Sequence, residues 1–266
     1  MTALDDAGAP PALSPARTAL HRVTSVVKLH FANPATVVLL PLFILGTILA
    51  LNLLIWLLIV AATPVEVRSE QQFADGFSEG VQWSGAASFI FVWHLIVAIQ
   101  AMNATFPYAL GFGATRRDYY LGTALTWVAV AAGWAALFGV LAWIEEATVG
   151  WGLGGRMFSA VYFGLDGPWM RIVYVFLLFL LFLFLGTISG AMYVRFRSFG
   201  VTALWIGIAF LLVGVIAIIV LTQSFAQVAE FLLSIGFGGV YALTLIPTAL
   251  AAVAGFFVLR RATPRN

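Results

Sequence analysis

Six apolar stretches dominate the pattern of hydrophobic and polar positions along the chain. Each holds about the 20 residues that an α-helix needs to cross a bilayer, and none contains Asp, Glu, Lys or Arg. The stretches cover residues 36–62, 84–105, 121–144, 172–194, 201–222 and 240–259. The pattern therefore predicts an all-α integral membrane protein with six transmembrane helices.

Two further segments have a different pattern. Residues 14–33 place apolar side chains on one helical face and Arg17, His21 and Lys28 on the other, which predicts an amphipathic helix lying in the membrane interface. The alternative is a cytosolic extension of the first span. Residues 223–239 are apolar but too short to span, so they predict a re-entrant or interfacial hairpin on the outer side. The alternative there is an ordinary surface loop.

The composition agrees with a membrane protein and excludes several functions. Hydrophobic residues make up 62% of the 266 residues and charged residues 9%, against about 25% charged in a soluble domain. The chain has no cysteine, so disulfides and thiolate metal sites are excluded. Its three histidines lack metal-ligand spacing, and no metal site is predicted. The Gly-x-Gly-x-x-Gly run at 150–155 has no preceding strand, so it does not predict a dinucleotide site.

The basic residues indicate how the chain crosses the membrane. Most of them lie in the N-terminal segment, in the second and fourth connectors and at the C-terminus: Arg17, Arg22, Lys28, Arg116, Arg117, Arg195, Arg197, Arg260, Arg261 and Arg265. The other connectors hold most of the acidic residues. By the positive-inside rule both termini are cytoplasmic, which requires an even number of spans. Residues 1–13 are expected to form a disordered cytoplasmic tail, and residues 34–266 the transmembrane domain.

The connector between the second and third apolar stretches, residues 106–120, is short and basic. Pro107 is expected to stop or kink the preceding helix, and Gly111 and Gly113 let the backbone turn. The Arg-Arg pair that follows cannot enter hydrocarbon cheaply. The connector therefore predicts a hinge at the membrane surface, where a partner can dock.

Few polar residues lie within the apolar stretches. Asn52, His94, Gln100 and Asn103 either bond neighbouring helices or face a substrate path. The lack of buried carboxylates argues against a secondary carrier driven by an ion gradient. Gly186 and Gly190, with Ser189 between them, form a small-residue face that allows close packing, either within one bundle or between two protomers.

This arrangement resembles the membrane subunit of ATP-binding-cassette exporters of the type-2 permease class. The topology matches over essentially the whole chain, whereas the motif match is confined to residues 109–122, which look like the connector of bacterial, especially actinobacterial-type, members. The resemblance implies that residues 14–33 are the elbow helix and 223–239 the outer gate hairpin. It also implies that the connector is a coupling helix seated in a partner ATPase, through Gly111, Phe112, Gly113, Thr115, Arg116, Arg117 and Asp118.

The same resemblance implies a half-transporter in the bacterial cell membrane, without enzymatic activity or cofactor of its own. It would pair with a second permease protomer, identical or different, while ATP and Mg²⁺ bind to separate ATPase subunits. Membrane lipids would surround it, and no nucleic acid is expected. Two alternatives remain: an intramembrane accessory or assembly protein without a transport role, and the secondary carrier disfavoured above.

Overall fold

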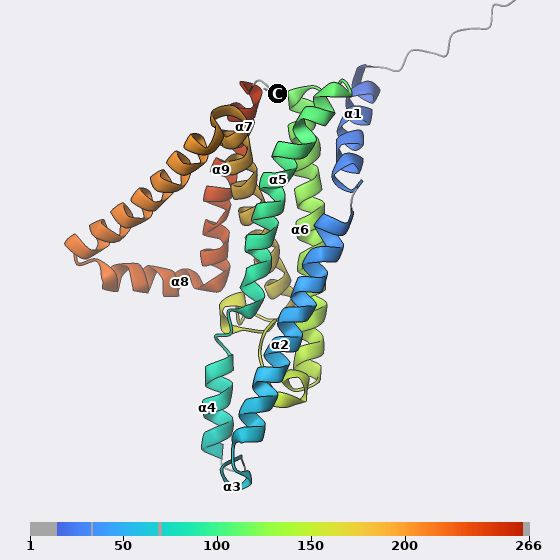
Figure 1. Ribbon diagram of the computed structural model, residues 1–266. Helices are drawn as coiled ribbons and strands as arrows, with labels where there is room; N and C mark the ends of the chain where they lie inside the picture. The colour runs from blue at the N-terminus through green and yellow to red at the C-terminus, as the bar shows by residue number, and fades with distance from the viewer. Residues whose placement is uncertain (1–14, 33, 69–70, 263–266) are drawn as a thin grey trace, which may run out of the picture.

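The computed structural model describes residues 15–32, 34–68 and 71–262, and within these ranges every regular element is a helix (Figure 1). The predicted tail, residues 1–13, lies outside them. In chain order the elements are α1 (Pro15–His30), η1 (Ala35–Leu39), α2 (Leu40–Ala62), α3 (Val65–Arg68), α4 (Gln71–Val81), η2 (Ala86–Ser88), α5 (Phe89–Gly111), α6 (Arg116–Ala147), η3 (Gly150–Gly154), η4 (Val161–Phe163), α7 (Pro168–Leu221), α8 (Phe225–Leu243) and α9 (Leu245–Arg260).

Five helical segments of the described residues are long and apolar enough to cross a membrane. The all-α class is therefore confirmed, and these helices suggest a membrane protein, whereas six spans stay a prediction. The difference arises in α7, a 54-residue element that contains both the 172–194 and the 201–222 stretches. Its helical backbone is broken at Arg197, where φ is 60° and ψ is −154°. The second part of α7 runs back down from the upper end of the molecule (Figure 1).

The core lies where α5, α6 and the first part of α7 pack together, as the buried side chains of all three helices show. The small-residue face of α7 lies directly against α5. A Cβ atom on Gly186 would overlap the Leu95 carbonyl oxygen, and one on Gly190 would lie 2.6 Å from the Met102 Cβ. Only glycine permits this approach, so the face serves packing within the bundle. Ser189 is buried in the same interface.

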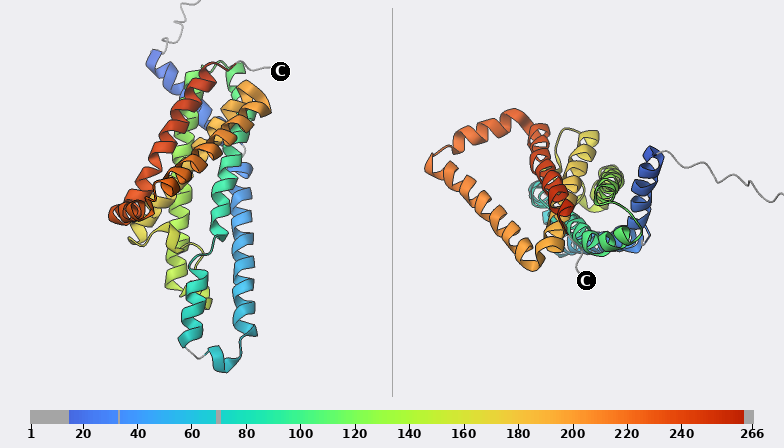
Figure 2. Two further views of the ribbon diagram at one scale, coloured as in Figure 1. Left: turned by 90° about the vertical axis from the view of Figure 1, so that its left-hand side faces the viewer. Right: turned by 90° about the horizontal axis from the view of Figure 1, so that it is seen from above.

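The segment after Arg197 leaves the bundle. The second part of α7 runs outward, α8 runs crosswise, and α9 returns alongside the first part of α7 (Figure 2). We call residues 198–243 the arm. Most of its large apolar side chains are exposed, among them Phe210 at 74%, Leu221 at 83% and Leu233 at 81%, whereas Tyr241 near its end is buried. The stretch predicted as a hairpin or a loop is thus largely helical, with a break at Gly236, where φ is +61°.

Helix α1 is amphipathic as predicted, and its apolar side packs against α6. Val26 is buried, and a Cβ on Gly122 of α6 would lie 2.6 Å from the Val26 Cβ. His21 and Lys28 are exposed on the other side, while the Arg17 side chain lies outside the described residues. The helix runs obliquely down the bundle (Figures 1 and 2), and its position in a bilayer stays a prediction.

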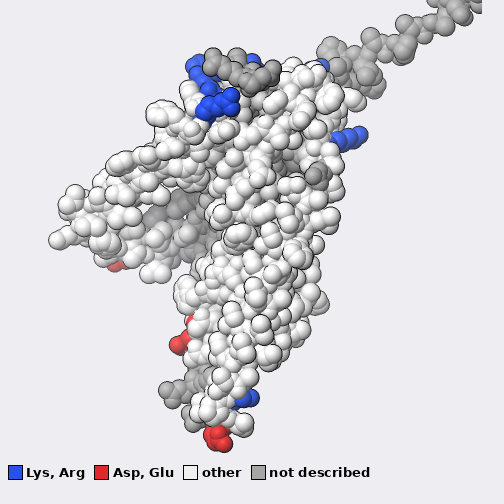
Figure 3. Space-filling model, in the orientation of Figure 1, with Lys and Arg blue, Asp and Glu red and all other residues white. Residues whose placement is uncertain are grey.

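Charged residues separate toward the two ends of the molecule. On the face shown in Figure 3, most Lys and Arg gather at the end where α1 begins and α9 finishes, and Asp and Glu gather toward the opposite end. One basic residue of the opposite end is Arg68 of α3. Apart from one acidic side chain on the arm, the middle of this face is uncharged, as expected for a surface in contact with hydrocarbon.

Candidate functional site

The candidate site is the connector between α5 and α6 at the basic end of the bundle. Of the two outcomes predicted for Pro107, a stop or a kink, the stop is wrong, because α5 continues to Gly111. The neighbouring side chains of Phe106 and Ala109 are buried, so tertiary packing holds the turn that Pro107 weakens. The backbone reverses at Gly113, where φ is +82°, a conformation that glycine adopts without strain.

Thr115 begins α6 as its N-cap. Its backbone is extended, and its side-chain oxygen accepts a 3.1 Å hydrogen bond from the Asp118 backbone N–H. The carboxylate of Asp118 in the first turn adds a favourable charge at the positive end of the helix dipole. The local sequence therefore fixes where the connector ends and where the 32-residue helix α6 begins.

Two polar contacts attach the connector to other helices. The Arg22 Nε of α1 donates to the Asp118 Oδ2 over 2.6 Å, and Asp118 is only 7% exposed. The Arg116 Nη1 donates to the Arg260 carbonyl oxygen at the end of α9 over 2.8 Å. These contacts join residues 96 and 144 positions apart in sequence. The connector is thus fixed to α1, α6 and α9.

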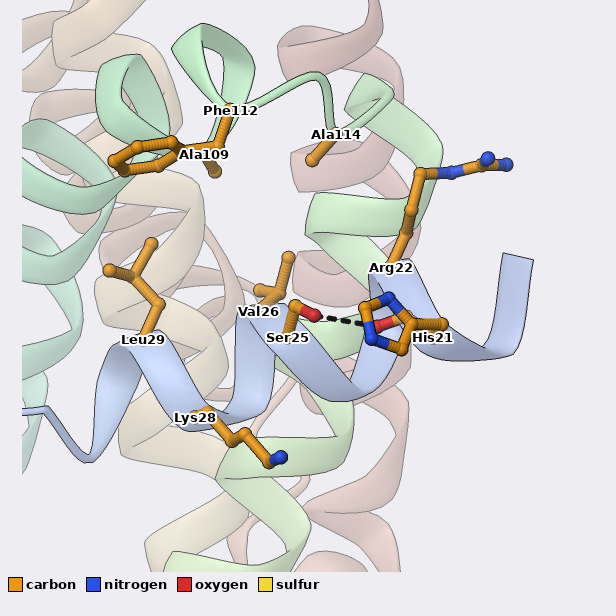
Figure 4. A pocket seen from close by; sticks show the side chains of 9 residues that line it. All are labelled: His21, Arg22, Ser25, Val26, Lys28, Leu29, Ala109, Phe112 and Ala114. Atoms are coloured by element: carbon orange, nitrogen blue, oxygen red, sulfur yellow. Dashed lines mark hydrogen bonds between the residues drawn. The ribbon is translucent and has the colours of Figure 1, made fainter. Parts of the chain in front are cut away.

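The tip of the connector, by contrast, is exposed. Phe112 has 85% of its surface accessible, and Gly113 and Arg117 are also exposed. Between this tip and α1 lies a groove of about 430 Å³ (Figure 4). Val26 and Leu29 of α1 point toward the connector in this view. The rim is polar and basic, and carries His21, Arg22, Ser25 and Lys28.

The predicted partner-contact residues thus fall into two groups. Gly111, Phe112, Gly113, Thr115 and Arg117 are exposed on the connector. Asp118 and Arg116 instead hold the connector in place. An apolar tip beside a basic side chain is suited to binding a surface that combines a hydrophobic pocket with acidic groups.

The four polar residues predicted to face a substrate path do not form one site. His94 is fully buried: its Nδ1 donates to the Ile90 carbonyl oxygen over 2.8 Å, and its ring packs against Trp134 and Phe179. The His94 Nε2 is buried without a hydrogen-bond partner in the described part of the chain. This histidine is therefore a core residue between three helices.

The other three are dispersed. The half-buried Asn52 amide donates to the Ile48 carbonyl oxygen of its own helix over 3.0 Å. Gln100 lines a groove of about 260 Å³ together with His30 and Thr105, where α1, α5 and α6 meet. The Oδ1 of Asn103 is buried and unpartnered among the residues that the structure describes. Of the four, only Gln100 lies where a polar ligand could reach it.

Sequence reasoning missed the role of Glu145 at the other end of α6. Glu145 is 1% exposed, and its carboxylate accepts hydrogen bonds from the backbone N–H groups of Met157 (2.9 Å), Phe158 (3.1 Å) and Ser159 (2.8 Å). The Ser159 hydroxyl and the Trp151 indole donate to it as well, over 2.6 and 3.0 Å. One carboxylate thus organises the loop between α6 and α7.

The signal for this loop is the glycine-rich run at 150–155, which does not predict a nucleotide site. Gly150, Gly152 and Gly154 all have positive φ, between +67° and +75°, as do Val149 and Trp151, at 53° and 60°. The segment is a left-handed turn, which glycine accepts readily and other residues do not. In this chain the glutamate shortly before the glycine-rich run is the residue whose carboxylate accepts hydrogen bonds from the loop backbone.

Searches for similar proteins add no further assignment: no protein-family model matches the sequence, and no curated protein or solved structure matches it significantly. Within the described residues, no group of three or more His, Cys, Asp or Glu side chains is placed to hold a metal ion.

Proposed function

We propose that this chain is the membrane subunit of an ATP-driven exporter, resembling the type-2 ATP-binding-cassette permeases. The observation that carries the proposal is a braced connector with an exposed aromatic tip, at the basic end of an all-helical membrane protein. Phe112 is 85% exposed, although the residues that follow it are fixed by three separate contacts. A connector that only joined two spans would need neither an exposed Phe112 nor the three contacts that hold the following residues in place.

The bracing supports a coupling role. A displacement of residues 112–115 would be transmitted to three helices. The Thr115 cap connects these residues to α6, the Arg22–Asp118 ion pair connects them to α1, and the Arg116 hydrogen bond connects them to α9. A partner ATPase that seats Phe112 and Arg117 would move these three helices together. ATP and Mg²⁺ would bind to that partner, and this chain would supply the passage.

The orientation follows from the charges. The end of α5, the start of α6 and the end of α9 lie at the end of the molecule where most basic side chains gather. The acidic side chains lie mostly toward the other end (Figures 1 and 3). By the positive-inside rule the basic end faces the cytoplasm of the bacterial cell, where ATPase subunits reside. Six spans with both termini inside are part of this proposal.

A second protomer would cover the arm. The most apolar window of α7 has no buried residue, so the passage would form where the arms and bundles of two protomers meet. The uncharged spans suit lipids, hydrophobic drugs or amphipathic peptides better than highly charged cargo. An accessory protein without a transport role would need no ATPase partner, so the following experiment separates the two functions.

The test is co-purification with a candidate ATP-binding-cassette ATPase subunit from the same genome, each expressed with its own affinity tag. Replacing Phe112 by Ala together with Arg117 by Glu should abolish association and substrate-stimulated ATP hydrolysis. Both side chains are exposed, so the variant is expected to fold. Arg116 is not used, because its substitution would also break the contact with Arg260.

The matched control is Arg261→Glu, a charge reversal at an exposed position of the same end, which should retain association. If the Phe112/Arg117 variant still binds the ATPase and still stimulates it, the coupling role is wrong.

A further inference from the structure

A polar cavity lies at the opposite end of α6 from the connector. It has a volume of about 510 Å³ and is bounded by the end of α6, the left-handed turn and the start of α7. Two arginines line it, Arg156 and Arg171, together with Glu145, Glu146 and Ser159. Its position and charge are independent of the connector, so a site here does not depend on the proposed function.

Arg171 has unused binding capacity. The residue is only 9% exposed, and its Nη1 donates to the Glu146 Oε1 over 2.6 Å. Its Nε is buried without a hydrogen-bond partner among the described residues. A buried donor without an acceptor is costly, and Glu146 compensates the charge only in part because its own side chain is 44% exposed. The Nε itself is shielded from solvent, so a second anionic partner in the cavity approaches the terminal nitrogens of the guanidinium.

The two acidic residues of the lining balance its two arginines in formal charge, and both carboxylates already have partners. The Glu145 carboxylate faces the loop backbone, whose N–H groups surround both of its oxygens. Glu146 is paired with Arg171. Arg156 is exposed, and no ion pair involves it within the described ranges. Two guanidinium groups thus border a cavity in which one carboxylate is satisfied by backbone donors and the other is partly solvated.

We propose that this cavity binds a phosphate group, held between Arg156 and Arg171. The planar guanidinium fork matches phosphate oxygens in geometry and charge. The phosphate can come from a phospholipid headgroup or from a soluble phosphate. The exposed apolar side chains of Leu165 and Val149 also line the cavity, and they would contact the glycerol and first acyl carbons of a lipid.

The experiment uses the full chain purified in maltoside micelles, which contain no phosphate. One arm measures binding of radiolabelled inorganic phosphate by equilibrium dialysis, and the other measures retention of added phosphatidylglycerol by native mass spectrometry. Arg156→Gln, an exposed substitution that leaves the fold intact, should weaken binding about tenfold, the loss of a charge-assisted contact. Arg68→Gln, another exposed arginine of the same end, should leave it unchanged.

A second variant tests Arg171 without removing it. Glu146→Gln frees the guanidinium from its carboxylate, so the affinity for phosphate should rise several-fold. A merely structural ion pair would give the opposite result, because its loss would loosen the start of α7.

Binding of phosphate in lipid-free micelles would identify a soluble ligand, and retention of phosphatidylglycerol alone would identify a lipid headgroup; both support the site. The proposal is wrong if the unmodified chain binds neither probe, if Arg156→Gln binds as tightly as the unmodified chain, or if Glu146→Gln fails to bind more tightly.

Discussion

The two parts of α7 on either side of Arg197 have similar apolar composition and opposite surroundings. Before the break, Phe179 and Leu183 are completely buried; after it, Phe210 and Leu221 are 74% and 83% exposed. Both parts contain glycines, but Gly186 lies against the backbone of α5, whereas a Cβ atom on Gly207 would have no neighbour within 4 Å. In a membrane, lipid is as apolar as a side chain, so hydrophobicity alone does not bring helices together. Close fit and hydrogen bonds do.

The largest effect on stability that we predict from the contrast between bundle and arm comes from a buried carboxylate of the bundle. Glu145→Gln should destabilise the chain by about 3–5 kcal/mol, because it removes a buried charge that accepts several hydrogen bonds and places an amide N–H₂ against backbone donors. Glu230→Gln, at an exposed position of the arm, should change the stability by less than about 0.5 kcal/mol. Urea unfolding in micelles measures both; equal effects would contradict the contrast between bundle and arm.

The next effect compares one residue type within one helix. Phe179→Ala should cost about 2–3 kcal/mol, mainly from the cavity left among the packed rings, because the apolar surroundings of the unfolded state reduce the transfer contribution. Phe210→Ala should be nearly neutral in the isolated chain, since its ring has few neighbours to lose. Thermal unfolding followed by circular dichroism compares them, and a Phe210 variant as unstable as the Phe179 variant would show that the arm packs on the bundle.

A smaller difference, of opposite sign, is expected at the glycines. Gly186→Ala should destabilise by about 1–3 kcal/mol, because the added Cβ overlaps the Leu95 carbonyl oxygen. Gly207→Ala meets open space and should stabilise the helix by about 0.5–1 kcal/mol. The same unfolding assay measures both. Two stabilising results would mean that α5 and α7 are farther apart than described.

The last predicted effect is a dependence of local stability on pH. It should appear in α1 and be absent from the arm. His30 is buried beside Tyr119, Thr123 and Trp127, and this burial lowers the pKa of His30 below its ordinary value. The unfolded histidine therefore takes up a proton below about pH 6.5 while the folded one stays neutral, so stability falls as the pH decreases, by at most about 1.4 kcal/mol per unit.

Hydrogen exchange measures this effect residue by residue. Protection of α1 should decrease between about pH 7 and about pH 5.5, after correction for intrinsic rates, whereas α8, which contains no histidine, should not change. His30→Gln should remove the pH dependence of α1. Persistence of the dependence in that variant would assign it to another group.

The sequence predicted the apolar helices because length and lack of charge define them almost alone. It also predicted the small-residue face, although it left open whether the partner was α5 or a second chain. It could not decide between a stop and a kink at Pro107, since continuation of α5 depends on burial of Phe106 and Ala109. Nor could it separate Asp118 from the exposed connector residues, because its partner, Arg22, lies 96 positions away.

The break in α7 lies in the predicted connector between the 172–194 and 201–222 stretches, but its form was beyond sequence reasoning for a related reason. Two apolar stretches separated by Arg195 and Arg197 are compatible with a connecting loop or with a break of the helical backbone at one residue. In the structure only Arg197 has a non-helical conformation within α7. The loop after α6 was missed because Glu145 finds its donors 12 to 14 residues later, across a left-handed turn that no periodic pattern reports.

The length of α6 has a mechanical consequence. Its 32 residues form one continuous helix, about 48 Å long at 1.5 Å per residue, with Thr115 at its start and Glu145 near its end. Neither Pro nor a non-helical residue interrupts it. The helix therefore acts as a stiff rod, so a tilt imposed at its capped end must displace the glycine-rich loop at its far end.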